Sequence, residues 1–89
     1  MKAKIKGKLI KKGDTSPVND RFQFRVFALE TDEEYPQSIM FQVTQDNCSW
    51  LDEIDEGANV EVLFELKGKP WRDTFINTLL VHRISVLSK

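Results

Sequence analysis

The segment Lys67–Phe75, with the sequence KGKPWRDTF, combines one tryptophan with three cationic side chains. Its glycine and proline predict a hairpin turn, in which Lys67, Lys69 and Arg72 surround Trp71. Exposing an indole to water is costly, so two interpretations are open. Trp71 either folds over the end of a core, with Arg72 stacked on it, or offers its face to a planar ligand. Cations beside an exposed aromatic ring are typical of sites that bind single-stranded nucleic acid.

The charges are segregated along the chain, although the net charge is only −1. Residues 1–12 contain six lysines and no acid, whereas residues 31–66 contain ten acids and no lysine or arginine. If the basic segments 1–12 and 67–72 meet in space, one face of the molecule will attract polyanions. The alternative is a solvated surface on which the two signs are separated without a binding role.

Few residues in the sequence could support catalysis. The acidic run from Asp52 to Glu56 lies near a predicted helix end, where we expect it to be solvated, and no G-x-x-x-x-G-K loop is present. Cys48 is the single cysteine and His82 the single histidine, which leaves no internal disulfide and no usual zinc site. We therefore expect no enzyme, no metal and no cofactor.

Length and composition predict one domain, residues 1–89, with 40% hydrophobic and 30% charged residues. The basic first segment is not followed by an apolar run, so it has the pattern of neither a signal peptide nor a membrane span. We expect a cytoplasmic protein without membrane association, and the single cysteine suits a reducing compartment.

Alternating apolar and polar residues predict five strands. In the first, Ile5, Gly7 and Leu9 share one face, and the lysines of the other face point outward. In the third, Ile39, Phe41 and Val43 share a face. The predicted strands are Lys4–Lys12, Arg21–Thr31, Ser38–Thr44, Asn59–Lys67 and Thr74–Val86, with a polar loop at Gly13–Asp20.

The period changes between the third and fourth predicted strands. Trp50, Leu51 and Ile54 are spaced as on one face of a helix. We expect Asp46 or Asn47 as its N-cap, Gly57 as its C-terminal stop, and Trp50 in the core. The resulting order β-β-β-α-β-β is that of an all-β, five-stranded OB-fold barrel with one short helix between strands 3 and 4. An SH3-like barrel, the competing fold, would not predict this helix.

The segments FALETDEEYPQSIMFQV and VEVLFELKGKPWRDTF, with the ending LLVHRI, resemble a family of small, largely uncharacterised OB-fold proteins of bacteria and their phages. That family is related to single-stranded-DNA-binding proteins. The similarity runs from about Ile5 to Ile84, and its most specific part is the block from Glu30 to Pro36. It departs at the fifth strand, where Phe75, Ile76 and Asn77 replace a Trp-Tyr-Thr run and His82 replaces an aromatic residue.

An OB-fold binds oligonucleotides across its second and third strands, between the loops that join strands 1 and 2 and strands 4 and 5. If Phe27 and Leu29 face the core, as the resemblance implies, then Phe22 and Phe24 point outward. Three explanations are open for these two rings: a stacking platform, a subunit interface, or a β-bulge that returns them to the core. The outward set of the third strand would be Ser38, Met40 and Gln42.

The first hypothesis is a sequence-tolerant single-stranded DNA-binding protein that assists replication, recombination or repair. Phe22, Phe24 and Trp71 would stack on bases. The phosphates would be held by Lys4, Lys6, Lys8, Arg21, Lys67, Lys69 and Arg72. Stacking does not distinguish the sugar, so RNA stays open as a ligand. The alternative is a protein-interaction or self-assembly module that buries Phe22, Phe24 and Met40, and we expect a homo-oligomer, at least a dimer.

Overall fold

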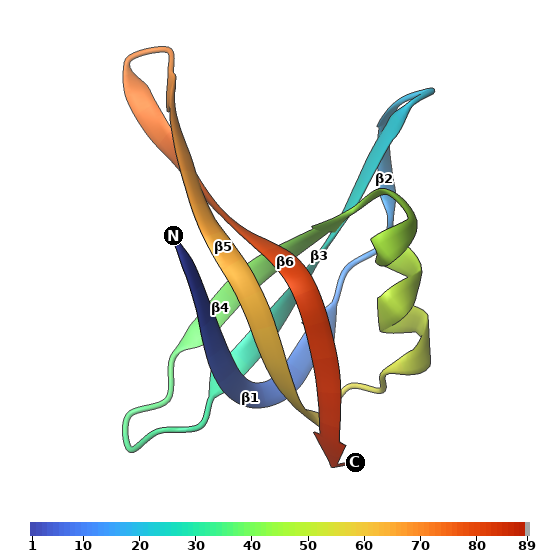
Figure 1. Cartoon of the computed structure of the whole chain (residues 1–89), viewed down its shortest axis with the longest axis vertical. Helices are drawn as coiled ribbons and strands as arrows, with labels where there is room; N and C mark the ends of the chain where they lie inside the picture. The colour runs from blue at the N-terminus through green and yellow to red at the C-terminus, as the bar shows by residue number, and fades with distance from the viewer. Residues whose placement is uncertain (89) are drawn as a thin grey trace.

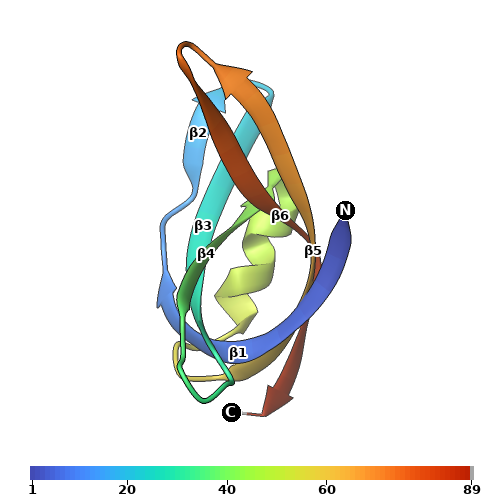
Figure 2. The ribbon, with the colours of Figure 1, turned by 90° about the vertical axis from the view of Figure 1, so that its left-hand side faces the viewer.

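The computed structural model describes residues 1–88 and has the predicted OB-fold architecture. Its strands are β1 (Lys2–Lys12), β2 (Ser16–Asn19), β3 (Phe22–Thr31), β4 (Ser38–Thr44), β5 (Asn59–Trp71) and β6 (Thr74–Ser88). One helix, η1 (Gln45–Glu53), joins β4 to β5. The strands are paired in the order β1-β5-β6-β4-β3, and β1 also pairs with β3, so the barrel is closed (Figures 1 and 2). None of the described helices is long and apolar enough to cross a membrane.

Strand β1 closes the barrel because it pairs on both of its edges. Residues Lys2–Lys8 pair with β5, and Gly7–Lys12 pair with β3. At Gly7, where the two ladders overlap, an added Cβ would lie 2.6 Å from the carbonyl oxygen of Glu30. Only glycine allows this close approach of two backbones, as expected for a tightly coiled strand.

The core contains the apolar faces that alternation predicts for β1 and β4 and that the resemblance implied for β3. Leu9, Phe27, Leu29, Phe41 and Val43 are buried, together with Leu51, Val60 and Val62. The Phe27 and Phe41 rings are stacked with their centroids 5.6 Å apart. Trp50, which was expected in the core, is only partly buried and packs against the core from η1.

The helix differs from its prediction in type and in its ends. It is a 3₁₀ helix capped by Thr44, without a side-chain hydrogen bond, rather than a helix capped by Asp46 or Asn47. It ends at Glu53, so Gly57 belongs to the following turn, where its φ is 98°. The physical reason lies at Gln45, which has a φ of 54° and donates its amide N–H to the Arg21 carbonyl. This bond ties the first helical residue to the start of β3.

The two loops expected beside the binding face are largely strands. The predicted polar loop Gly13–Asp20 contains β2, which pairs with β3 in a hairpin. The predicted turn from Lys67 to Asp73 is mostly ladder, since β5 and β6 pair continuously up to Trp71 and Thr74. Only Arg72 and Asp73 form the turn, and the φ of Arg72 is 55°, a left-handed conformation typical of two-residue hairpin turns. Both hairpins project from the same end of the barrel (Figure 1).

Candidate nucleic-acid interface

One outer surface of the barrel runs from β3 to β1 through registered strand pairs. Val26 lies opposite Gln42, Gln42 opposite Leu80, Leu80 opposite Glu65, and Glu65 opposite Lys2. Directly opposed residues in neighbouring strands share a face of the sheet. The outward residues of β3, β4, β6, β5 and β1 therefore form a continuous surface.

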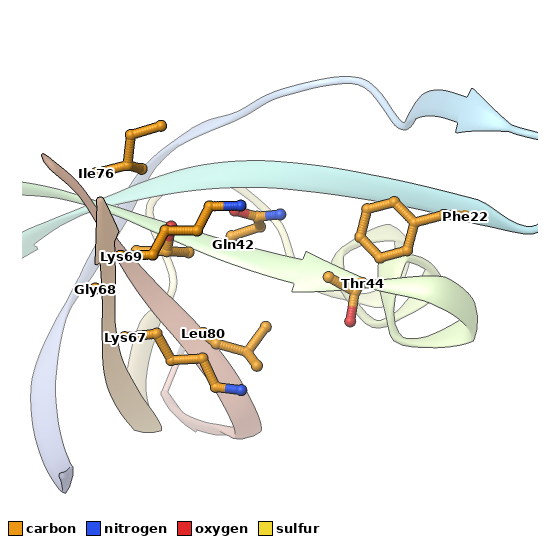
Figure 3. A pocket seen from close by; sticks show the side chains of 9 residues that line it. Phe22, Gln42, Thr44, Lys67, Gly68, Lys69, Ile76 and Leu80 are labelled. Atoms are coloured by element: carbon orange, nitrogen blue, oxygen red, sulfur yellow. The ribbon is translucent and has the colours of Figure 1, made fainter. Parts of the chain in front are cut away.

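A pocket of about 380 Å³ opens on this surface between the two projecting hairpins. We call it the hairpin pocket. Its lining includes Phe22, Gln42, Thr44, Lys67, Lys69, Ile76, Thr78 and Leu80. Figure 3 shows Phe22 on one side and the side chains of Lys67 and Lys69 on the other, with Gln42 between them. None of the lining residues is acidic, so the pocket combines an aromatic ring with two cations.

Trp71 continues the cationic side of the hairpin pocket. Because β5 has regular alternation, Trp71 shares the face of Lys67 and Lys69 and lies about 7 Å beyond Lys69. Its ring is 48% exposed, and the Arg72 guanidinium carbon lies 5.5 Å from the ring centroid. The stacking of Arg72 on Trp71 is thus present. The tryptophan lies at the hairpin tip, pairing with Thr74, rather than in a broad loop.

The two outward phenylalanines have different environments. Phe22 is 36% exposed and lines the hairpin pocket, whereas Phe24 is partly buried and lies outside its lining. The pairing of β3 with β4 is regular from Phe24 to Glu30, and neither ring belongs to the core. A bulge that returns them to the core is therefore excluded.

The β1 lysines share the outer surface but lead away from the pocket. Lys4, Lys6 and Lys8 are exposed, and they lie opposite Leu63, Glu61 and Asn59 of β5. Asn59 is about 26 Å along the strand from Lys67. Arg21 is also outside the hairpin pocket, in a smaller hollow of about 220 Å³ next to Asp20 and Asp46. Of the ten residues predicted to bind nucleic acid, the pocket brings together Phe22, Lys67 and Lys69.

Sequence reasoning missed the part of the lining that comes from β6. Ile76, Thr78 and Leu80 enter the pocket because β6 pairs in parallel with β4 at Leu80 and Gln42. Such a long-range parallel contact has no local sequence signal. Gln42 itself was predicted to face outward, and the alternation of β4 was the signal that located it.

A hydrogen-bonded pair lies beside the inner end of the pocket. His82 Nε2 is 2.9 Å from Glu65 Oε1, and Glu65 is the strand partner of the pocket residue Leu80. The hydrogen bond from His82, supported by the positive charge of Lys67, holds the pKa of Glu65 below its ordinary value. Along the described part of β5, Glu65 is the acidic residue nearest to the pocket. Lys67 and Lys69 follow it toward the hairpin tip.

Other groups that could do chemistry are not assembled into a site. Among residues 1–88, no three histidine, cysteine or acidic side chains are grouped as metal ligands would be. Cys48 is buried, and its burial raises the pKa of the thiol, which disfavours the nucleophilic thiolate.

The family model described as a domain of unknown function, DUF3127, matches residues 4–85. The chain belongs to this family. Comparison with the curated proteins finds no match. The DUF3127 fold nevertheless has clear structural relatives, as the resemblance to proteins related to single-stranded-DNA-binding proteins implied.

The mitochondrial single-stranded DNA-binding protein Rim1 of S. cerevisiae superposes with a TM-score of 0.84 at 14% identity, over 99% of this chain and 96% of Rim1. The N-terminal domain of PriB from Thermoanaerobacter tencongensis, whose structure is dimeric, gives 0.73 at 19% identity, over 99% and 97% of the two chains. The single-stranded DNA-binding protein of Thermus aquaticus gives 0.79 at 16% identity, over 98% of this chain and 50% of that one. These likenesses show the OB-fold of the DUF3127 chain.

Proposed function

We propose that this protein binds single-stranded DNA with little overall sequence preference, as an accessory of replication, recombination or repair. The observation that carries the proposal is the hairpin pocket, where Phe22 faces Lys67 and Lys69 and no acid lines the wall. A single strand presents flat bases and a chain of phosphates, which are the groups that an aromatic ring and two ammonium groups bind.

The surroundings of the pocket support a strand that extends beyond it. Trp71 and Arg72 lie farther along the same hairpin face and would hold a second base and its phosphate. At the other end, the outer surface leads to the lysines of β1, where Lys4, Lys6 and Lys8 would contact further phosphates. Phe24 and Arg21, near the pocket on β3 and its turn, complete the proposed contact set.

Structural likeness also favours this proposal. The chain has the fold of proteins that are themselves single-stranded DNA-binding proteins, and the likeness covers nearly the whole of the chain. An OB-fold binds its ligand between the loop that joins its first and second strands and the loop that joins its fourth and fifth strands. In this chain the β2–β3 and β5–β6 hairpins extend from these two places, and the pocket lies between them.

The test is a titration of tryptophan fluorescence with oligo-dT, with oligo-rU as a parallel ligand. We expect quenching, because a base would stack on the exposed Trp71, and we expect the affinity to fall as salt is raised. Phe22→Ala should weaken binding about fivefold to a hundredfold, the loss of one stacked base. Tyr35→Ala is the control, because Tyr35 is also an exposed aromatic residue but lies outside the hairpin pocket, in the turn between β3 and β4. No fluorescence change and no retention of oligo-dT at low salt would refute the proposal.

Self-association is a second candidate function, favoured by exposed apolar side chains next to the hairpin pocket. Met40 is 66% and Phe75 74% exposed, and Met40 and Leu66 line a hollow that shares Gln42 and Thr78 with the hairpin pocket. Sedimentation velocity should show an oligomer that Phe75→Asp dissociates and Tyr35→Asp does not. A wild-type monomer at all concentrations would eliminate this candidate.

A further inference from the structure

The hairpin pocket contains a polar side chain that the phosphate-binding role leaves unexplained. Gln42 is partly buried and lines the pocket between its two walls, and no hydrogen bond of its side-chain amide is found among residues 1–88. No buried side-chain polar atom of these residues lacks a partner, so the Gln42 amide is open to solvent and to a ligand in the pocket. The other three glutamines all donate their amide N–H groups to backbone carbonyls: Gln23 to Gln45, Gln37 to Tyr35, and Gln45 to Arg21. With respect to residues 1–88, Gln42 is therefore the one glutamine whose donor and acceptor are both available to a ligand.

The neighbours of Gln42 fit a planar group with polar edges. The ring of Phe22 and the side chains of Ile76 and Leu80 supply apolar contacts, while Lys69 extends toward the same space as the Gln42 amide (Figure 3). A pocket of about 380 Å³ is within the range that holds small organic ligands.

The chemistry of the amide distinguishes a base from a phosphate. A phosphate offers acceptors only, which the lysine ammonium groups satisfy with their donors. A carboxamide offers one acceptor next to two donors, and the edge of a nucleobase offers the complementary pair. A free amide in a pocket with an aromatic wall thus matches a base edge better than it matches the backbone of the strand.

We propose that the hairpin pocket receives one nucleobase, stacked on Phe22, and that Gln42 reads its edge through a pair of hydrogen bonds. This inference rests on the proposed function and refines it. One nucleotide of the bound strand would be recognised by its base, while the others are held by stacking and charge. Gln42 is then a residue that determines specificity, whereas Lys67 and Lys69 set the overall affinity.

The test compares the affinities of dT8, dC8 and dA8 for the wild-type protein and for Gln42→Leu, at one fixed salt concentration. We expect the wild type to prefer one of these oligonucleotides by about fivefold or more, the discrimination of one good bidentate contact. Gln42→Leu should bring the three affinities to within about twofold of one another and leave the salt dependence unchanged, since no phosphate contact is lost. Gln37→Leu is the matched control, because it removes an exposed glutamine of the β3–β4 turn.

The outcomes separate the two proposals. Equal binding of all three oligonucleotides by the wild type, or a preference that Gln42→Leu retains, would overturn base reading and leave the proposed function standing. Absence of binding to every oligonucleotide would overturn both. Gln42→Met provides a second variant of similar shape, and the circular dichroism of both variants verifies that the barrel is intact.

Discussion

At the scale of single residues, Arg25 illustrates why a charged side chain lies so close to the core. Its guanidinium donates to the carbonyls of Gly13 and Cys48, at 2.6 and 3.2 Å, and to Asp52 at 2.8 Å. The Arg25 side chain is 11% exposed, whereas Asp52 is 66% exposed. Water can therefore easily replace Arg25 as the partner of the exposed Asp52, but not as the donor to the partly buried carbonyls of Gly13 and Cys48. Arg25 fastens η1 and the end of β1 to β3.

We therefore expect Arg25→Met to lower the free energy of unfolding by about 2–3 kcal/mol, because it leaves partly buried carbonyls without donors. Asp52→Asn should cost less than about 1 kcal/mol, since an exposed ion pair contributes little. Urea denaturation of both variants measures the two losses. Equal losses would show that the ion pair, and not the carbonyl bonds, is what stabilises this junction.

Glu65 gives the chain a pH dependence that His82 controls. The pKa of Glu65 is lowered in the folded state, mainly by the His82 hydrogen bond, so the folded protein favours the carboxylate. This stabilisation is present above the ordinary glutamate pKa and is lost as the pH falls through the lowered folded-state pKa. In His82→Leu the pKa of Glu65 should rise toward its ordinary value, and stability should fall less steeply on acidification.

Carboxyl NMR titration of wild type and His82→Leu measures the Glu65 pKa directly. An unchanged titration of Glu65 in the variant would contradict the assignment of its shift to His82. Gln42→Leu provides a further comparison for the Glu65 titration. This substitution lies on the same surface but leaves both His82 and Glu65 in place.

At the scale of secondary-structure elements, two strand glycines have opposite tolerance for a side chain. A Cβ on Gly7 would meet backbone 2.6 Å away, whereas a Cβ on Gly68 would have as its nearest neighbour the Asn77 side-chain oxygen, at 3.1 Å. Backbone atoms of a closed barrel cannot move aside, but a surface side chain can rotate.

Gly7→Ala should consequently destabilise the barrel by about 1–3 kcal/mol through overpacking. Gly68→Ala, the matched control in the projecting part of β5, should change stability by less than about 0.5 kcal/mol. Thermal and urea unfolding of the two variants test this contrast. A tolerated Gly7→Ala would mean that β1 can separate from β3 without cost.

Strand alternation was enough to predict most of the elements. The inward sets of β1 and β4, Ile5 to Leu9 and Ile39 to Val43, follow from alternation, since each strand has one buried face. For β3, the family resemblance implied that Phe27 and Leu29 face the core, and both are buried. β2 and the projecting end of β5 beyond Lys67 were not predicted as strands, because exposed strands have no buried face to impose a period. Turn-forming residues such as Pro17, Gly68 and Pro70 therefore led to the prediction of a loop and a turn in two segments that are paired as strands.

At the scale of the whole molecule, the candidate site was predicted by residue type better than by position. The register brings Phe22 from β3 to Lys67 and Lys69 from β5, as expected from the fold. The contributions of β6 and the direction of the β1 lysines depend on pairings between distant segments, which a single sequence does not display. The sequence therefore located the two walls of the pocket and the outward Gln42 between them, and missed the lining from β6.

The distribution of charge over the surface leads to a prediction for salt dependence. If each pocket lysine holds one phosphate of a single strand, Lys67→Gln with Lys69→Gln should reduce the slope of log affinity against log salt by about 1.4. Lys11→Gln is the control, because Lys11 is an exposed lysine on the part of β1 that pairs with β3. Fluorescence titrations at several salt concentrations supply the slopes, and an unchanged slope in the double variant would remove these lysines from the phosphate contacts.

The double-sided pairing of β1 has a consequence for how the chain reaches its folded state. Strand β1 is synthesised before both of its partners: β3 follows soon after it along the chain, but β5 comes much later, with Lys2 opposite Glu65. While the ribosome is still translating η1, the apolar side of Ile5 and the free edge of β1 have nothing to cover them. Non-local pairing of this kind slows folding and prolongs exposure of strand edges. The dense lysines of β1 would then act before the barrel exists, since like charges on an open edge keep nascent chains from pairing with one another.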